Sequence, residues 1–377
     1  MHKTRYFNQV TKDYTIDQYI HRLIGVDAEE ESLLRVACER VWDLPSEGSM
    51  PNSLDVALLL GELGVDETAL IVALLSSTRL MESSDLAELK QVFGDKIIDM
   101  AQSVVQLHSF KGESDEREPE QAERLRRMLL SMVSDVRAVL IKLAFRVQRL
   151  RQLKLADDDE QQEIARESLE IFAPIANRLG IGQLKWELED LAFRYLEPDT
   201  YKSIARSLDE KREEREQFIT DIVDKLREIT EEQGINAEVY GRPKHIYSIW
   251  KKMTGKRRSF DELFDVRAVR VIVDTIAECY VMLGLVHSQW RHINKEFDDY
   301  IANPKENGYQ SLHTAVYGPN AKPVEIQIRT RQMHEFAEHG VAAHWRYKEA
   351  GSGKANLQSG IESLRKLLDA TKTDDRE

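Results

Sequence analysis

The sequence predicts an all-helical first half followed by an α/β second half. Three observations lead to this division. Apolar residues recur at helical spacing through residues 1–195. The segment Phe264–Val273 is rich in β-branched residues, which favour strands. Two alternating runs, Ser311–Tyr317 and Pro323–Arg329, are separated by a short turn segment and therefore predict a β-hairpin.

Composition narrows the class of protein. The chain has 377 residues, enough for two or three domains, and 32% of them are charged. Its longest apolar run, Ala69–Leu75, is too short to cross a bilayer, so we expect a cytoplasmic protein without a membrane partner. Only Cys38 and Cys279 are present, which excludes a disulfide framework or a thiolate zinc site.

The net charge of −13 disfavours general attraction to nucleic acid, so no direct nucleic-acid binding is expected. An anion site would therefore require a local basic cluster. Residues 242–258 contain such a cluster, with seven Lys and Arg side chains in seventeen residues. A solvated basic surface is the plainer explanation, but this cluster lies in an acidic chain and shortly before the hairpin.

Glycines, a proline and a polar loop divide the first half into separate helices. Gly64 and Gly94 are expected to end helices, residues 112–118 form a polar loop, and Pro174 begins or bends a helix. The segment Lys185–Tyr195 predicts a helix whose aromatic and leucine side chains, Trp186 among them, dock it onto the core. A highly charged helix follows from Pro198 towards Gly234, and we expect residues 196–236 to connect the two halves.

The second half begins with a strand at Ala237–Tyr240 that enters a Gly-Arg-Pro-Lys turn and then a helix. A glycine turn at a helix start is a common phosphate-binding arrangement, although a single such turn is weak support. Further helices are predicted at Thr275–Trp290 and Arg331–Tyr347, and a polar tail at residues 351–377.

In the symmetric hairpin register, Tyr317 faces Pro323 and the side chains sort onto two faces. The apolar face carries Leu312, Thr314, Val316, Val324, Ile326 and Ile328, and the polar face carries Ser311, His313, Glu325, Gln327 and Arg329. Simple solvation could explain a polar face. A carboxylate, amide, imidazole and guanidinium beside a turn with Lys305, Asn307 and Tyr309 suit a phosphorylated, aromatic ligand better.

Five blocks in this order carry a family resemblance: GRPKHIYSIWKKM, FDELFDVRAVR, EFDDYIANPKENGYQSLHT, VEIQIRT and GVAAHWRYK. Together they resemble the synthetase domain of the long RelA/SpoT homologues, in particular the monofunctional RelA type. The resemblance implies a helical HD-type domain in residues 1–195 and a nucleotidyltransferase-like mixed-sheet synthetase domain in residues 237–350. It also implies GTP pyrophosphokinase activity in the stringent response, with Mg²⁺-dependent transfer of the β,γ-pyrophosphoryl group of ATP to the 3′-OH of GTP or GDP. The products are (p)ppGpp and AMP.

The resemblance also assigns roles to individual residues. Asp265 and Glu325 would hold Mg²⁺, and Glu325 would also serve as the general base. The ATP side would consist of Arg242, Lys244, Ser248, Lys252 and Arg270, with Arg242 and Arg270 clamping adenine. The GTP side would consist of Lys305, Asn307, Tyr309, His313 and Gln327, with Tyr309 stacking on guanine.

Two departures distinguish the chain from bifunctional relatives. Glu296, Asp298 and Asp299 form an acidic motif where those relatives carry a basic one, which predicts a higher Mg²⁺ demand and a bias between GDP and GTP. The positions of the hydrolase metal site hold Asn52, Ser76, Ser77 and Phe145, and no His-Asp dipeptide occurs in the chain. We therefore expect an inactive pseudo-hydrolase domain.

Two alternatives remain open. A bifunctional synthetase/hydrolase is disfavoured by Ser76, Ser77 and Phe145, and a non-catalytic alarmone-binding module would not need both Asp265 and Glu325. Full-length members of the resembled family continue into a C-terminal half that senses ribosomes carrying uncharged tRNA. We expect that half, and the response to that partner, to be missing from this chain.

Overall fold

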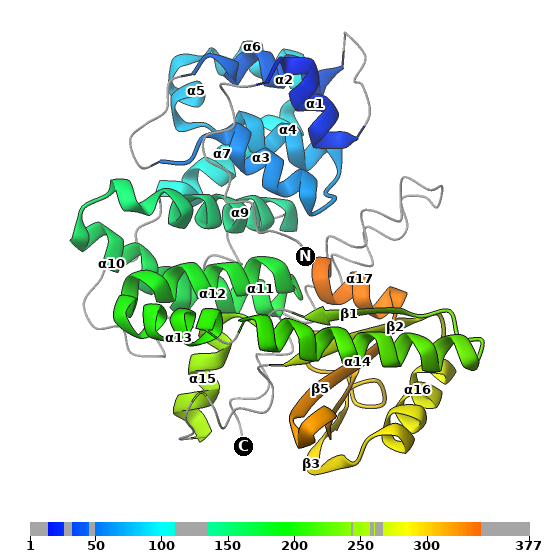
Figure 1. Cartoon of the computed structure of the whole chain (residues 1–377). Helices are drawn as coiled ribbons and strands as arrows, with labels where there is room; N and C mark the ends of the chain where they lie inside the picture. The colour runs from blue at the N-terminus through cyan, green and yellow to red at the C-terminus, as the bar shows by residue number, and fades with distance from the viewer. Residues whose placement is uncertain are drawn as a thin grey trace, which may run out of the picture. The chain divides into compact units, whose positions relative to one another are not determined.

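The computed structural model describes residues 14–25, 32–44, 50–109, 135–210, 212–242, 244–256, 260 and 267–340 (Figure 1). Within these ranges the chain forms two compact units. The first, here called the helical unit, contains the described residues up to Ala176 together with Glu187–Tyr195. The second, here called the sheet unit, contains Asn177–Trp186 and Leu196–Gly340.

The helical unit confirms the predicted all-α first half. Its helices are α1 (Ile16–Ile24), α2 (Leu33–Trp42), α3 (Ser53–Glu62), α4 (Glu67–Leu75), α5 (Thr78–Ser83), α6 (Leu86–Phe93), α7 (Asp95–Ser109), α9 (Val136–Gln152), α10 (Asp158–Glu167), α11 (Ala173–Arg178) and most of α12 (Gly182–Leu196). A π-helical turn, Ser168–Phe172, joins α10 to α11 directly before Pro174, where a bend or helix start was expected. Residues 112–118, the expected polar loop, lie outside the described residues.

Helices α3 and α4 form the centre of the helical unit because their middle segments are buried on all sides. Every residue of Leu54–Leu60 and of Ala69–Leu75 is buried. Their starts are fixed by side-chain caps, since the Asn52 side chain accepts from the Leu54 N–H and Asp66 accepts from the Ala69 N–H, both at 2.9 Å. Each cap satisfies a backbone donor that the first helical turn leaves unpaired.

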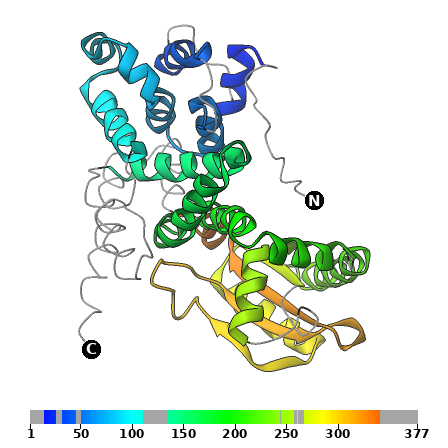
Figure 2. The same cartoon turned by 90° about the vertical axis from the view of Figure 1, so that its left-hand side faces the viewer.

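The sheet unit contains α13 (Pro198–Glu210), α14 (Arg212–Glu232), α15 (Ile246–Lys256), α16 (Ile276–Gln289) and α17 (Arg331–His339). Its strands are β1 (Glu238–Arg242), β2 (Ala268–Val273), β3 (His292–Asp299), β4 (Leu312–Tyr317) and β5 (Pro323–Thr330). In the described residues they form a five-stranded sheet of order β1-β2-β5-β4-β3, seen beside the green helix α14 in Figure 2. Only the β2–β5 pair is parallel, which confirms the predicted mixed sheet.

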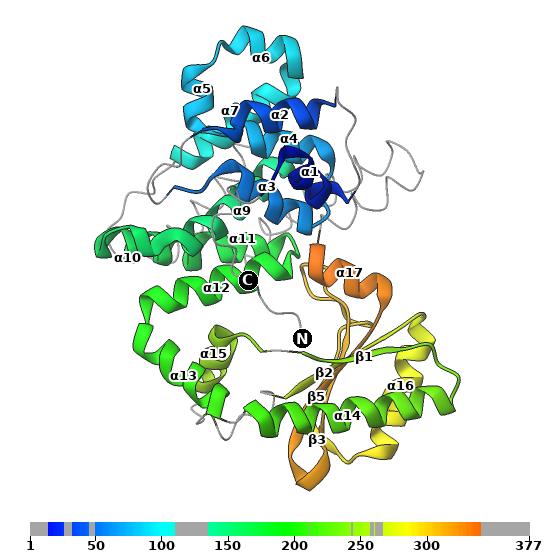
Figure 3. The same ribbon diagram turned by 45° about the horizontal axis from the view of Figure 1, so that its top comes forward.

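The hairpin register confirms the prediction pair by pair. Tyr317 pairs with Pro323, and Leu312 pairs with Ile328. One face of the sheet therefore carries the apolar residues, and helices α14 and α16 cover it (Figure 3). Phe218 and Leu226 of α14 belong to that core, so this helix packs on the sheet along much of its length.

Strand β3 was not among the predicted elements. Its pairing with β4 is irregular between His292 and Phe297, and Lys295 has a φ of 70° within it. A bulge of this kind breaks the period-2 pattern, and the strand is mostly exposed. Neither alternation nor an apolar run was therefore present to indicate it.

Helix α17 was predicted over Arg331–Tyr347. Its described part ends at His339 and is followed by Gly340 with a φ of 54°, a conformation that glycine tolerates at helix ends. Residues 341–377 lie outside the described ranges. Among the described helices, none has the length and apolar composition to cross a membrane.

Candidate functional site

One row of side chains crosses all five strands on the face opposite α14 and α16. The ladder registers align Tyr240 of β1, Arg270 of β2, Gln327 of β5, His313 of β4 and Asp298 of β3. Side chains two residues apart on a strand share a face, so this face also receives the neighbours of these residues. The predicted polar face of the hairpin is thus part of a polar row that spans the sheet.

Glu325 lies on this face in an environment that keeps it ionised. Burial alone would raise the pKa of its carboxyl, but the hydrogen bond from His313 and the nearby charges of Lys244 and Lys252 hold that pKa far below its usual range. His313 Nδ1 lies 3.3 Å from Glu325 Oε1. Glu325 pairs with Ala268 at the start of β2. Asp265, the predicted second carboxylate, stands three positions before Ala268 and lies outside the described residues.

A cavity of about 210 Å³ opens beside this row. It brings together five predicted site residues from separate elements: Arg242, Lys305, Asn307, Tyr309 and His313. The remaining wall was not predicted, and it consists of Asn177, Gly180, Gly182, Lys185, Trp186, Phe336 and Ala337. The segment before the connector therefore contributes directly to the cavity of the sheet unit.

The loop between β3 and β4 presents the predicted acceptor-side residues. The Tyr309 hydroxyl lies 2.9 Å from His313 Nε2, and the Tyr309 N–H donates to Asn307 Oδ1 at 3.2 Å. Lys305 Nζ lies 4.2 Å from the ring centre of Tyr300, which also meets the His313 ring edge-on at 5.3 Å. Tyr300 supports this loop, and its position in a turn gave no sequence signal of that role.

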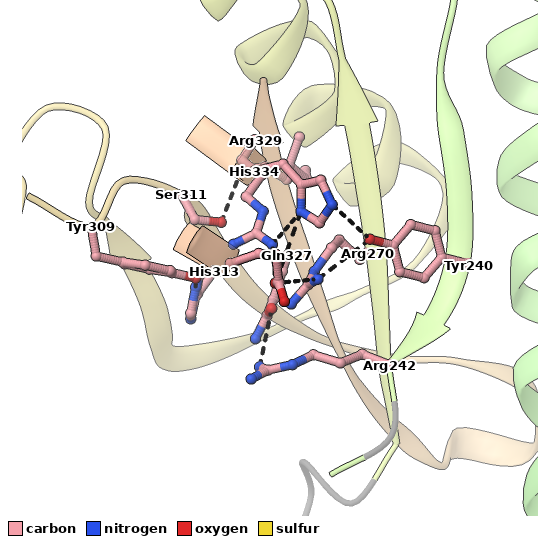
Figure 4. Close-up of polar contacts among 11 residues, drawn as sticks. Tyr240, Arg242, Arg270, Tyr309, Ser311, His313, Gln327, Arg329 and His334 are labelled. Carbon is pink, nitrogen blue, oxygen red and sulfur yellow. Dashed lines mark hydrogen bonds and ion pairs between the residues drawn. The ribbon is translucent and has the colours of Figure 1, made fainter. Parts of the chain in front are cut away.

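Arg242 is held by partners that the sequence did not reveal. Its guanidinium lies 4.7 Å from the Trp186 ring centre. It also donates to Gln327 Oε1 at 3.2 Å, as Figure 4 shows. The Trp186 ring also stacks on the His245 ring, with centroids 5.1 Å apart. Trp186 was expected to dock a helix onto the core, whereas it lines the cavity.

Arg270, predicted to clamp adenine, lies in a buried ion-pair cluster (Figure 4). Arg270 and Arg329 both donate to Glu338 Oε1, at 2.8 and 3.0 Å. Both guanidinium side chains are almost fully buried. Burial first, and then the charges of Arg329 and Arg270, lower the pKa of the adjacent His334 to about 4. The sequence placed Arg329 on the polar face of the hairpin but gave it no individual role, and it gave no indication of Glu338.

The acidic motif is divided between two roles. Asp299 Oδ1 accepts from the N–H groups of Ile301 and Ala302 at 3.0 and 2.8 Å, and its Oδ2 accepts from the Tyr280 hydroxyl at 3.0 Å. This carboxylate is therefore a turn cap. Asp298 faces the site as the cross-strand neighbour of His313, and Glu296 lies on the irregular part of β3.

Of the predicted donor-side residues, Lys244 precedes α15, and Ser248 and Lys252 are four positions apart within it. Residues at this spacing lie on one side of a helix. The charges of both lysines act on Glu325, which places that side of α15 towards the carboxylate.

Glu325 is chemically suited to hold Mg²⁺. Magnesium prefers carboxylate oxygens, keeps several waters, and needs only one or two protein carboxylates when phosphates complete its coordination. The described residues contain no group of three or more His, Cys, Asp or Glu side chains that could hold a metal alone. An ionised Glu325 beside the start of β2 fits the sparser donor set that a nucleotide-bound Mg²⁺ requires.

A second cavity lies within the helical unit and gathers all four residues that the sequence predicted at degenerate hydrolase positions. Asn52, Ser76, Ser77 and Phe145 line it together with His108. The Phe145 ring stacks on the His108 ring with centroids 3.7 Å apart. None of the described residues lining this cavity carries a carboxylate.

Comparisons with known proteins match both parts of the chain. Residues 241–352 match the region found in RelA / SpoT proteins, and residues 37–182 match the HD domain. The chain is 51% identical over 354 residues to a GTP pyrophosphokinase of Photobacterium angustum, covering 91% of this chain and 48% of the relative. The chain thus spans about half the length of the curated relatives it matches.

Two further similarities differ in what they describe. A probable guanosine-3′,5′-bis(diphosphate) 3′-pyrophosphohydrolase of a Synechocystis species is 44% identical over 330 residues, covering 86% of this chain and 43% of the relative. Among solved structures, small alarmone synthetase 1 of Bacillus subtilis bound to pppGpp has 25% identity and a TM-score of 0.31. That match covers 45% of this chain and 95% of the other.

Proposed function

Because the chain belongs to the long RelA/SpoT family, we propose that it is a GTP pyrophosphokinase. In the reaction, the 3′-oxygen of GTP or GDP attacks the β-phosphorus of ATP. The bond between that phosphorus and the α,β-bridging oxygen breaks, AMP leaves, and the guanine nucleotide gains a 3′-diphosphate. The single observation that carries this proposal is the position of ionised Glu325 on one sheet face with His313, Arg242 and the cavity containing Tyr309.

Phosphoryl-type transfer depends on positioning and charge neutralisation more than on covalent chemistry. Glu325 accepts the hydrogen bond of the 3′-hydroxyl and receives its proton as the new bond forms. A carboxylate with a strongly lowered pKa is a weak base, so orientation of the hydroxyl is its larger contribution. Lys244 and Lys252, which already act on Glu325 electrostatically, bind the phosphates of ATP.

Different residues bind the two bases. Tyr309 stacks on guanine, and Lys305 and Asn307 contact the acceptor nucleotide beside it. Arg242, whose guanidinium lies against the Trp186 ring, stacks on adenine. Arg270 supports that side of the site through its hydrogen bond with Tyr240 at 3.3 Å, and Ser248 and Gln327 complete the polar contacts.

Glu325 and Asp265 would hold Mg²⁺, with Asp265 contributed by the segment before β2. When bound, the ion neutralises phosphate charge and lowers the pKa of the attacking hydroxyl. The acidic residue Asp298 lies on the same face, which supports an elevated Mg²⁺ demand.

Incubation with ATP, GTP or GDP and Mg²⁺, followed by separation of the nucleotides, tests the proposal. We expect AMP and pppGpp or ppGpp in equal amounts, and neither from Glu325→Gln. Nucleotide binding without turnover in the wild-type protein would instead support a non-catalytic alarmone-binding module.

We further propose that the helical unit does not hydrolyse (p)ppGpp, although one relative is named as a hydrolase. A metal-dependent hydrolase needs carboxylate and imidazole ligands around its metal. Asn52 and Ser77 are engaged as helix caps, and Phe145 fills space against His108. Release of pyrophosphate from ppGpp in the presence of Mn²⁺ would contradict this proposal. As the family resemblance implies, we propose that a response to ribosomes carrying uncharged tRNA belongs to the C-terminal half of long family members.

A further inference from the structure

A continuous chain of polar contacts joins the proposed guanine-stacking residue to the proposed catalytic carboxylate. The Tyr309 hydroxyl lies 2.9 Å from His313 Nε2, and His313 Nδ1 lies 3.3 Å from Glu325 Oε1. Figure 4 shows Tyr309 and His313 pointing towards each other from the loop and from β4. A stacking role alone does not require the hydroxyl of Tyr309 to meet this histidine.

The chemistry of the three groups fixes the direction of the contacts. An ionised carboxylate can only accept, so the hydrogen shared with Glu325 must be on His313 Nδ1. A neutral imidazole with its hydrogen on Nδ1 has a lone pair on Nε2, which accepts from the Tyr309 hydroxyl. The hydroxyl therefore selects the tautomer that donates to Glu325.

In this series of polar contacts, His313 in the middle is held rigidly, whereas Tyr309 at one end lies on a loop. His313 is fixed in the sheet by pairing with Gln327, and the Tyr300 ring meets its ring at 90°. Tyr309 is on the loop before β4 and depends on local contacts such as the one with Asn307. A base stacked on Tyr309 would restrict its ring and hence the position of its hydroxyl.

We propose that the Tyr309 hydroxyl and His313 are positioning groups that orient the Glu325 carboxylate when a base is stacked on Tyr309. This inference rests on the proposed function, because it assigns Tyr309 two separable roles in the same reaction. The ring face binds the acceptor base. The hydroxyl, acting through His313, makes the bound acceptor react faster.

Tyr309→Phe separates these roles, since it keeps the ring and removes only the hydroxyl. We expect the KM for GTP to remain within about twofold of wild type and kcat to fall roughly five- to tenfold, as expected for one lost hydrogen bond. His313→Asn keeps a donor near Nδ1 but loses the acceptor for Tyr309, so it should match Tyr309→Phe. The double variant should be no slower than either single variant, because both substitutions interrupt the same series of polar contacts to Glu325.

The matched control is Tyr317→Phe, which removes an exposed tyrosine hydroxyl at the end of β4, the strand that carries His313. It should leave kcat unchanged. A wild-type kcat in Tyr309→Phe, or a loss confined to KM, would overturn the inference and leave Tyr309 with stacking alone.

A readout independent of turnover uses the ¹⁵N NMR signals of the His313 ring. In the wild-type protein we expect a protonated Nδ1 and an unprotonated Nε2, and a change at Nδ1 on addition of GTP. In Tyr309→Phe the GTP-dependent change should be strongly reduced. A ring protonated on Nε2 alone would overturn the linkage even if the enzyme is active, whereas a wild-type protein that makes no (p)ppGpp would overturn the proposed function.

Discussion

The guanidinium of Arg242 lies 4.7 Å from the centre of the Trp186 ring, although 56 positions separate the two residues in the chain. Trp186 belongs to the sheet unit and lines its cavity. The indole therefore packs against the guanidinium, which can also stack on a nucleotide base.

Replacing Trp186 by Ala should weaken donor binding. The contact is expected to contribute about 0.5–2 kcal/mol, so the KM for ATP should rise by roughly two- to thirtyfold. Titration of ATP at saturating GTP measures this effect. Trp186→Phe keeps an aromatic face and should restore most of the affinity, whereas an unchanged KM in Trp186→Ala would remove Trp186 from the donor site.

Glu338→Gln should destabilise the sheet unit because it leaves Arg270 and Arg329 without their shared carboxylate. Removing one partner of a buried ion pair costs about 3–5 kcal/mol. Urea unfolding at neutral pH measures the loss. Asp274→Asn breaks the exposed pair with Arg331 and should cost less than about 1 kcal/mol of stability. Equal losses in the two variants would contradict a stabilising role for the buried Glu338 ion pairs.

His334 should make stability depend on pH. Its folded-state pKa of about 4 lies below its ordinary value of 6.5, so the unfolded chain binds the proton more readily between these values. Stability is therefore fully present above pH 6.5 and decreases as the pH falls towards 4, by up to about 3 kcal/mol. Unfolding free energies across this range should show a smaller decrease in His334→Gln than in wild type, and identical slopes would refute the assignment.

Gly308→Ala should distort the acceptor loop. Gly308 has a φ of 77°, and an added Cβ would lie 3.1 Å from the Phe336 ring. We expect lower stability, by about 1 kcal/mol or more, and a higher KM for GTP. Gly284→Ala is the matched control, since no atom lies within 4 Å of its added Cβ and a helical alanine should be slightly stabilising.

The parts of the fold that the sequence predicted depend on local periodicity. The hairpin register follows from period-2 alternation, because a slip of one residue would turn Val324 and Ile326 away from the core. Strand β3 has no such pattern, since it is exposed and is interrupted near Lys295. The hydrophobic period of the sequence therefore could not predict strand β3.

The site could be predicted less completely than the fold. Residues that the family blocks contain, such as Arg242 and Tyr309, could be assigned in advance, and the structure brings them to one cavity. Trp186 and Glu338 are recognised only through contacts between distant segments. In the sequence, an aromatic or acidic residue on an amphipathic helix looks like an ordinary core or surface position.

The most direct measurement follows two labels of ATP in one reaction with GTP and Mg²⁺, one on the α-phosphate and one on the γ-phosphate. We expect the γ label in the 3′-diphosphate of the guanine nucleotide and the α label in an equal amount of AMP. Glu325→Gln should produce neither. Appearance of the γ label as inorganic phosphate with the α label in ADP would contradict pyrophosphoryl transfer.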